Sequence, residues 1–256
     1  MVDLQVNKDI IEDVQLMIFD KDGTLMELYH YWSQMITMRA KLICKRLVLN
    51  KDHEDNLIYE MGVDKKNGKL RPEGPVGIKK REIVLQSAVD YLTTIGCNDA
   101  HDVCQKAFKE VDALSSTNLR QFIKPIKGSV ELINALSEGK CKVAIATTDR
   151  SERAELAMGF LGFKDKIDLI VGADHVTKTK PDPEMVFRIL DMLNISKNHA
   201  VMAGDALTDV QMGINAHLKA SVAVLTGFAT AEQCRAITPY IAESVAHITV
   251  IKNIRI

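Results

Sequence analysis

The sequence has no long hydrophobic run and almost no net charge. Its 256 residues contain no stretch of about 18 apolar residues, the length that a helix needs to cross a membrane. The amino-terminal segment MVDLQVNKDIIEDVQ is too polar for the apolar part of a secretory signal. The formal net charge of −1 argues against a protein that binds nucleic acid or another polyanion through bulk electrostatics. We therefore expect a cytoplasmic protein with neither a membrane nor a nucleic acid as its partner.

Cysteine and histidine patterns typical of metal or redox sites are also absent. The five cysteines are an odd number and form no C-x-x-C pair, and the seven histidines show no metal-ligand spacing. We expect reduced, buried cysteines that act as small apolar side chains. Neither an internal repeat nor a low-complexity tract is found. The length of 256 residues suits one or two domains, and the 46% of hydrophobic residues is enough for a sizeable core.

The segment LMIFDKDGT, from Leu16 to Thr24, carries the clearest functional signal in the sequence. Its four apolar residues lack polar alternation, which is typical of a short strand buried on both faces of a parallel sheet. Asp20 and Asp22 follow at the carboxyl end, where open α/β sheets bind ligands. Two neighbouring carboxylates repel each other unless a cation or a shared proton lies between them, and Mg²⁺ suits such oxygen ligands. An ordinary strand with an Asp-Gly turn is the alternative interpretation.

Residues 25–124 are expected to form a block of helices that interrupts the sheet. Apolar residues recur there at three- and four-residue steps, and no convincing strand lies among them. The predicted helices cover residues 28–47, 52–61, 79–95 and 99–114. A loop rich in glycine, proline and charge is expected over residues 62–77.

From Pro125 onward, helices and strands alternate. Strands are predicted at residues 141–146, 168–171, 200–203 and 221–225, and helices at 128–138, 151–161, 183–193 and 209–215. This alternation implies right-handed crossovers and a doubly wound parallel sheet. The predicted fold class is α/β, with a Rossmann-like core from residues 1–24 and 125–256 and an inserted α-helical domain from residues 25–124.

Polar side chains follow the strands of this second segment. Thr147 comes after one hydrophobic strand, and Asp205 and Asp209 lie in GDALTD after another. Lys180 lies in KPDPE, where two prolines stiffen the approach to a helix. Because parallel strands present the same end to one edge of the sheet, these residues are expected to meet the two acids of the first strand. Acids bind Mg²⁺, while a hydroxyl and an ammonium suit the oxygens of a phosphoryl group.

Four ordered signatures make the chain resemble the haloacid dehalogenase superfamily. They are DKDGT from Asp20, Thr147 after a strand, Lys180 in KPDPE, and Gly204-Asp205 followed by Asp209. The helical insertion is similar to the cap domain of the phosphoglycolate phosphatase-like and β-phosphoglucomutase-like branch. In the superfamily an Ala-Gly pair commonly follows the helix after the last signature. This chain has Ala216-His217, which leaves the local backbone geometry open.

The resemblance implies a chemical role for five residues. Asp20 would attack phosphorus to form an aspartyl-phosphate. Asp22 would protonate the leaving group and later deprotonate the attacking water. Thr147, Thr148 and Lys180 would contact the phosphoryl oxygens, although Thr148 stands where the superfamily commonly has Asn.

The resemblance also implies a metal site. Mg²⁺ would be bound by Asp20, by Asp22 through its backbone carbonyl, and by Asp205. Asp209 would support the site from behind by orienting waters or the phosphate-binding lysine. Lys21 is expected to point away from the acids on the opposite face, in a structural role.

Simpler interpretations exist for several of these residues. Thr147 could be a mere hydroxyl at a strand end, with Thr148 or Asp149 as the functional neighbour. Lys180 could be a solvated surface lysine, and Asp209 could only cap its helix.

The function predicted from these residues is a Mg²⁺-dependent phosphatase that acts on a small phosphomonoester, similar to phosphoglycolate phosphatases. Asp22 disfavours carbon–halogen cleavage, because dehalogenases of the superfamily lack an acid at that position. The alternatives are a sugar phosphomutase similar to β-phosphoglucomutases, a phosphonate hydrolase, and a receiver-like domain that acts by binding. A small phosphorylated metabolite is the expected partner, and a monomer or homodimer is the expected assembly.

Overall fold

The chain forms two compact units in the computed structural model, which describes residues 1–77, 79, 81–117 and 119–251. The core unit contains Met1–Glu27 and Lys124–Ile256, and the inserted unit contains Leu28–Ile123. The predicted core extends into residues 252–256, which lie outside the described residues.

Backbone hydrogen bonds explain where the two units separate. The chain leaves the core after Glu27, three residues later than the sequence predicts. The Gly23 N–H donates to the carbonyl oxygen of Met26 at 2.9 Å, which keeps this turn in the core. The Glu27 N–H then donates to the carbonyl oxygen of Lys124 at 2.8 Å, and Met26 forms a bridge with Pro125. The outgoing and returning segments therefore run side by side within the core unit.

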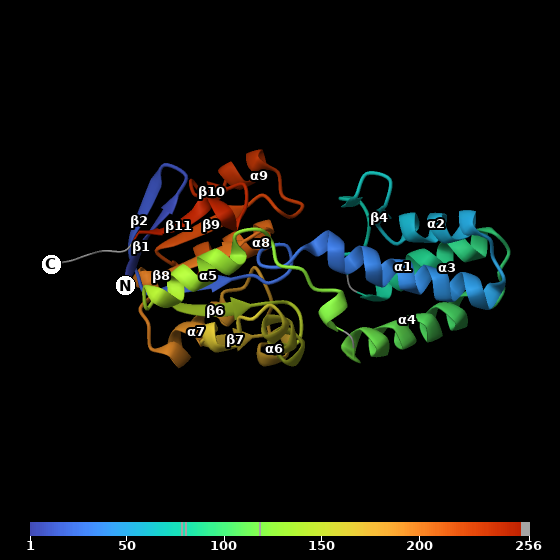
Figure 1. Ribbon diagram of the computed structural model, residues 1–256. Helices are drawn as coiled ribbons and strands as arrows, with labels where there is room; N and C mark the ends of the chain where they lie inside the picture. The colour runs from blue at the N-terminus through green and yellow to red at the C-terminus, as the bar shows by residue number, and fades with distance from the viewer. Residues whose placement is uncertain (78, 80, 118, 252–256) are drawn as a thin grey trace. The chain divides into compact units, whose positions relative to one another are not determined.

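A six-stranded parallel sheet forms the centre of the core unit, in the order β10-β9-β8-β3-β6-β7 (Figure 1). The strands are β3 (Leu16–Phe19), β6 (Lys142–Ala146), β7 (Leu169–Val171), β8 (Ala200–Gly204), β9 (Ala220–Val224) and β10 (Ile241–Ala242). Strand β3 lies between β6 and β8, with Phe19 opposite Ile145 and Ala203. Every residue of β3 is fully buried, as its unbroken apolar run predicts. The predicted parallel α/β sheet is therefore confirmed.

Helices cover both faces of this sheet. They are α5 (Ser129–Glu138), α6 (Ser151–Phe160), α7 (Glu184–Leu193), α8 (Leu207–Asn215) and α9 (Ala231–Arg235). Helices α7 and α8 pack on one face, where Ile18 joins Met185, Ile189 and Met212 in one apolar cluster. Right-handed crossovers place α5 and α6 on the opposite face. Each connection returns the chain to the amino end of the next strand, so all carboxyl ends meet at one edge.

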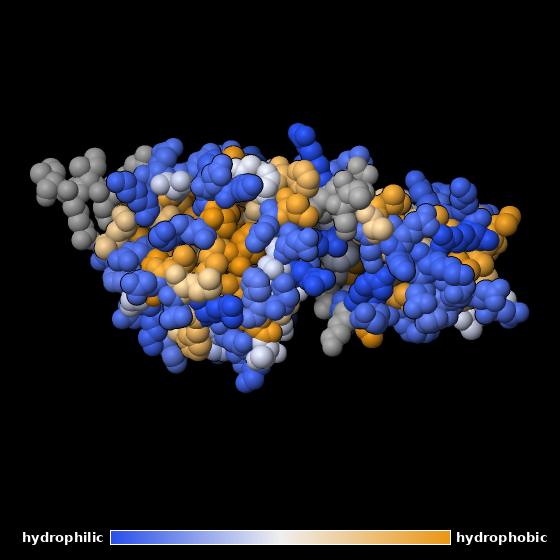
Figure 2. Space-filling view, turned by 90° about the horizontal axis from the view of Figure 1, so that it is seen from below, coloured by the Kyte–Doolittle hydropathy of each residue, from blue (hydrophilic) through white to orange (hydrophobic). Residues whose placement is uncertain are grey.

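The outer faces of two core helices are not uniformly polar. Leu156 and Phe160 of α6 and Phe187 and Met192 of α7 are exposed. Figure 2 shows apolar surface on the underside of the core unit, between polar side chains. Exposed apolar residues are common on folded proteins. Helical periodicity therefore predicts which face of these helices is buried, but it does not predict that the exposed face is polar.

The turn after α8 keeps a left-handed conformation although it lacks the expected glycine. His217 has a φ of 54°, a conformation that glycine adopts more readily than other residues. Its N–H donates to the carbonyl oxygen of Ile214 at 2.9 Å, and the next N–H, of Leu218, donates to that of Gly213 at 3.1 Å. The carboxyl end of α8 therefore keeps its capping hydrogen bonds, although His217 stands where the superfamily commonly has glycine.

A second sheet, which was not predicted, joins the two ends of the core unit. It contains β1 (Val2–Val6), β2 (Asp9–Val14) and β11 (Ile248–Ile251), antiparallel in the order β11-β1-β2. In β1, Val2, Leu4 and Val6 are buried whereas Gln5 is exposed. This alternation is typical of a strand with one solvated face. The many polar residues of the amino-terminal segment make this alternation hard to recognise in the sequence.

The described residues of the inserted unit form the expected helices and one unexpected hairpin. The helices are α1 (Leu28–Leu47), α2 (Lys51–Glu60), α3 (Arg81–Thr94) and α4 (Ala100–Thr117); position 80 of the predicted helix 79–95 lies outside the described residues. Strands β4 (Val63–Asp64) and β5 (Lys69–Leu70) pair within the predicted loop 62–77, so the expectation of no strand was wrong. Asp64 closes their turn by accepting hydrogen bonds from the backbone and side chain of Asn67, at 3.0 and 2.7 Å. Two-residue strands are too short to show alternation.

The cysteines behave as the sequence predicts. All five are free thiols, and all except the half-buried Cys97 are buried. Burial raises the pKa of Cys104 and of Cys141 to about 12, so these thiols stay protonated near neutral pH. Within the described part of the chain, no helix combines the length and apolar character needed to cross a membrane.

We expect Gly128→Ala to destabilise the core unit more than Gly162→Ala does. Both glycines have a positive φ, +90° and +78°, so alanine is strained at either position by about 1 kcal/mol. A Cβ at position 128 would also lie 2.5 Å from the Cα of Ala246, whereas one at position 162 meets nothing within 4 Å. The overlap adds roughly 1–3 kcal/mol. Urea-unfolding midpoints measure the difference, and equal losses in the two variants would contradict it.

Candidate active site

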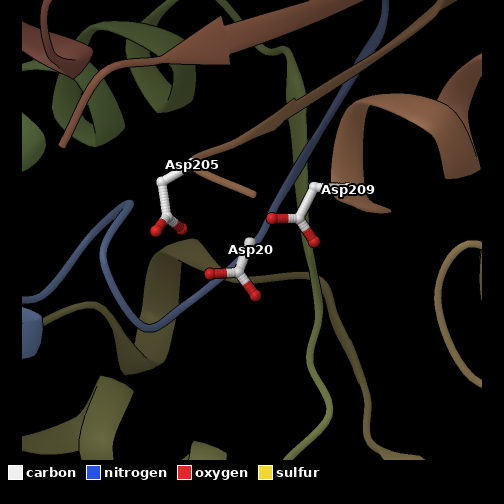
Figure 3. A group of neighbouring side chains, drawn as sticks. All are labelled: Asp20, Asp205 and Asp209. Atoms are coloured by element: carbon white, nitrogen blue, oxygen red, sulfur yellow. The ribbon is translucent and has the colours of Figure 1, made fainter. Parts of the chain in front are cut away.

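Three acids from two segments of the chain meet at the carboxyl edge of the parallel sheet. Asp20 directly follows β3, Asp205 directly follows β8, and Asp209 lies in the first turn of α8. Figure 3 shows their side chains gathered around one point. One carboxylate oxygen of each lies within 4.8 Å of those of the other two, and all three residues are buried. The strand order brings these acids together as predicted, because β3 and β8 are neighbours.

Lys180 ties two of these acids together from the loop before α7. Its Nζ lies 2.5 Å from Asp20 Oδ1 and 2.7 Å from Asp209 Oδ1. The Lys180 side chain is only 3% exposed, so the alternative of a solvated surface lysine is wrong. Burial disfavours its charge, but the two carboxylates outweigh burial and raise the pKa of Lys180 above its usual value. The lysine therefore stays an ammonium, which fixes the rotation of the Asp20 carboxylate.

Asp209 performs both of the tasks considered for it. One oxygen accepts a hydrogen bond from the Ala206 N–H at 3.0 Å, which caps α8, while the other contacts Lys180. Its carboxylate also belongs to the acidic group itself. The structure thus places Asp209 beside Asp20 and Asp205, closer to the metal-ligand set than the supporting position predicted for it.

Asp205 is held by two segments that approach it closely. The hydroxyl of Thr24, which is fully buried, donates to Asp205 Oδ1 at 3.0 Å. A Cβ at Gly23 or at Gly227 would overlap the Asp205 carboxylate. The Thr226 hydroxyl donates to the Gly23 carbonyl oxygen, which joins the two approaching segments. Glycine is therefore required on both sides of this carboxylate.

The charges of this group are unbalanced. Burial raises the pKa of Asp20 and raises that of Asp205 well above its usual value, and repulsion between the acids adds to both shifts. Lys180 brings one positive charge into contact with two of the three carboxylates, those of Asp20 and Asp209. Closely spaced buried oxygens with excess negative charge fit a hard divalent cation. Asp20, Asp205 and Asp209 are the side chains that could hold one.

Asp22 and Lys21 differ from their predicted arrangement. Lys21 does not point away: its Nζ lies 2.8 Å from Asp22 Oδ2 and 3.2 Å from Asp149 Oδ2. Strand geometry ends at Phe19, so the two-residue repeat no longer separates neighbouring side chains. The Asp22 carboxylate faces this ammonium and is not part of the acidic group. Burial raises the pKa of Asp22, although Lys21 opposes the shift, and a raised pKa suits a proton donor.

Thr147 lies at the end of the strand beside β3. The register pairs Phe19 with Ile145, so Thr147 is two residues past that pair on the neighbouring strand. It is buried, and its hydroxyl accepts a hydrogen bond from the Asp149 N–H at 3.1 Å. Thr148 is exposed. Their contacts with a phosphoryl group stay predictions.

Sequence reasoning missed the residues that support the acids. Thr24 was part of the first signature but had no role assigned, and Thr226 and Gly227 had no signal, because a small residue after a strand is common. The sequence suggests Asp149 only as a possible functional neighbour in place of Thr147, whereas in the structure it pairs with Lys21. These supporting contacts depend on loops whose approach no periodicity predicts.

Known proteins are similar to this chain in sequence. The family of haloacid dehalogenase-like hydrolases matches residues 14–217. A pyrophosphatase PpaX from Halalkalibacterium halodurans is 32% identical over 102 residues, covering 40% of this chain and 47% of that protein. An N-acetylmuramic acid 6-phosphate phosphatase from Pseudomonas aeruginosa is 31% identical over 105 residues, covering 41% of this chain and 46% of that protein. The matched part of this chain thus spans about half the length of each relative.

The fold is shared with solved structures. A protein described as a predicted phosphoglycolate phosphatase from Haemophilus somnus superimposes with a TM-score of 0.67, at 16% identity, over 92% of this chain and 96% of that one. A likeness at this identity supports the architecture alone.

We expect Mg²⁺ to raise the thermal unfolding temperature. A cation that binds only the folded protein stabilises it by about 2.7 kcal/mol at a hundredfold excess over its Kd, which corresponds to roughly 5–10 °C at this chain length. Asp205→Asn removes one of the clustered carboxylates and should lose most of this shift. Asp165→Asn, at an exposed acid of the core unit, should keep it. Equal shifts in wild type and Asp205→Asn would contradict the metal site.

We also expect Gly227→Ala to weaken Mg²⁺ binding while the protein stays folded. The added methyl group would overlap the Asp205 carboxylate and displace it. Changes in groups that orient a metal ligand lower affinity by about 10- to 100-fold. Gly159→Ala, where a Cβ meets nothing within 4 Å, is the matched control. Titration calorimetry measures both affinities, and an unchanged affinity in Gly227→Ala would show that Asp205 is not a ligand.

Proposed function

Because the chain belongs to the haloacid dehalogenase-like hydrolase family, we propose that it is a Mg²⁺-dependent phosphatase that cleaves a small phosphomonoester through an aspartyl-phosphate. The observation that carries the proposal is the contact between Asp20 and Lys180 inside the acidic group. It supplies an oriented carboxylate nucleophile next to a fixed positive charge. Such a nucleophile needs positive charge nearby, because the phosphate that it attacks is also an anion.

The first step forms one bond and breaks another. An oxygen of Asp20 bonds to phosphorus while the bond from phosphorus to the ester oxygen breaks, and Asp22 gives its proton to that departing oxygen. Lys180 keeps the attacking carboxylate in orientation, and both Lys180 and Thr147 would contact phosphoryl oxygens. Mg²⁺, held by the side chains of Asp20, Asp205 and Asp209 and by the backbone carbonyl of Asp22, would neutralise charge on the phosphoryl group.

The second step restores the enzyme. A water attacks the phosphorus of the aspartyl-phosphate and gives its proton to the carboxylate of Asp22. The bond between phosphorus and the Asp20 oxygen breaks, which releases phosphate. Asp22 is then protonated again and ready for the next ester.

The names of the relatives guide the choice of substrates. One relative is a pyrophosphatase and another is a phosphatase for a sugar 6-phosphate, so pyrophosphate and N-acetylmuramic acid 6-phosphate belong in the assay. Phosphoglycolate and other small alkyl esters complete the panel. A sugar phosphate that isomerises without release of phosphate would favour the mutase alternative.

We expect phosphate release from at least one alkyl ester with Mg²⁺, and its loss in Asp20→Asn. The amide cannot act as an anionic nucleophile, so kcat should fall by more than about a thousandfold. Asp165→Asn, an exposed acid, should retain wild-type kcat. Free phosphate measured by a colorimetric assay gives the rates. Undiminished turnover in Asp20→Asn, or turnover of pyrophosphate alone, would contradict the proposal.

A further inference from the structure

The ion pair between Lys21 and Asp22 has no place in the two steps above. We propose that Lys21, held by Asp149, is a positioning residue that fixes the Asp22 carboxylate for proton transfer to the leaving oxygen. This inference rests on the proposed function, because the position of Asp22 matters to catalysis only if an ester is cleaved. It assigns a role to two residues that the superfamily signatures leave undefined.

The contact between Lys21 and Asp22 restricts the acid strongly. Lys21 Nζ lies 2.9 Å from Asp22 Oδ1 and 2.8 Å from Oδ2, so one ammonium contacts both oxygens. The Lys21 side chain is only 4% exposed, whereas that of Asp22 is 27% exposed. A buried cation thus holds a carboxylate that still reaches solvent. Rotation of the carboxylate would break at least one of these contacts.

Asp149 fixes the ammonium in turn. Its Oδ2 lies 3.2 Å from Lys21 Nζ and 3.7 Å from Arg153 Nε, and its Oδ1 accepts from the Arg150 N–H at 2.9 Å. The backbone is fixed as well, since the Asp149 N–H donates to the Thr147 hydroxyl at 3.1 Å. One residue therefore links the predicted proton donor, through Lys21, to the predicted phosphate-binding hydroxyl.

Stability alone does not account for this arrangement. Burying an ammonium costs free energy, and well-packed apolar side chains often replace buried ion pairs without loss of stability. A charged residue at position 21 is thus explained better by what it positions. A misplacement of about 1 Å in a reacting group can lower a rate by roughly a hundredfold.

The proposal predicts a dependence on the leaving group. An alkoxide needs a proton as it departs, whereas 4-nitrophenolate is a stable anion that leaves without one. Loss of Lys21 should therefore impair the cleavage of alkyl esters much more than that of 4-nitrophenyl phosphate. General damage to the site would impair both equally.

The experiment compares kcat/KM for these two leaving groups, because kcat/KM reports the steps up to departure of the leaving group. For Lys21→Met and Asp149→Asn we expect a fall of about 10- to 100-fold with the best alkyl ester, and less than about threefold with 4-nitrophenyl phosphate. Lys142→Met is the matched control, since Lys142 pairs with Asp168 at 2.7 Å at the amino end of β6. It should match wild type on both substrates.

A second comparison tests whether Lys21 acts through Asp22. In an Asp22→Asn background, Lys21→Met should change kcat/KM by less than about twofold, because the group that it positions is gone. Equal losses with both leaving groups, or a full Lys21 effect without Asp22, would overturn the positioning role. Circular dichroism checks folding, and the partly exposed Asp149 supplies the same test if Lys21→Met fails to fold. A wild-type enzyme inactive on every ester would instead overturn the proposed function, and this inference with it.

Discussion

Electrostatic repulsion between buried carboxylates is the constraint around which this molecule is arranged. Asp20 is distant in sequence from Asp205 and Asp209, yet the three carboxylates gather within 4.8 Å. Little water remains to screen their charges, so the repulsion is much stronger than at a surface. The ammonium of Lys180 contacts two of the three and offsets part of it. The remaining excess of negative charge gives the group its expected affinity for a cation, and the cation would in turn make attack on an anionic phosphate feasible.

The fold keeps these acids close despite their repulsion. Strand β3 is buried on both faces and lies between β6 and β8, so the backbone that leads to Asp20 cannot move away from the other acids. Asp205 is enclosed by the backbone at Gly23 and Gly227 and by the Thr24 hydroxyl. Charged groups fixed before the substrate arrives need no reorganisation during the reaction, which is a main source of catalytic power. The rigidity of the sheet therefore keeps the three carboxylates in a fixed geometry.

The sequence was sufficient for the parts of this structure that depend on regular periodicity. The parallel strands, the helices between them and the convergence of Asp20, Asp205 and Lys180 follow from apolar runs and from the common direction of strands. The antiparallel sheet at the chain ends was missed because β1 alternates within a polar segment, and the β4–β5 hairpin because its strands are too short. Lys21 was placed on the wrong side because the two-residue repeat was extended beyond Phe19, where the strand ends. Supporting contacts such as that of Thr24 depend on loop approach, which no local pattern encodes.

The chain leaves the core unit and returns to it at neighbouring residues, which bears on whether the inserted unit could be exchanged. Glu27 and Lys124 are joined by a backbone hydrogen bond and by a side-chain ion pair of 2.7 Å, so the core closes on itself at the point where the insertion begins. Exchange of residues 28–123 would leave every strand of the parallel sheet, and Asp20, Asp205 and Asp209, in the core unit. Such a junction is compatible with a different insertion at the same point, because the core unit would keep its own closure and its acidic group.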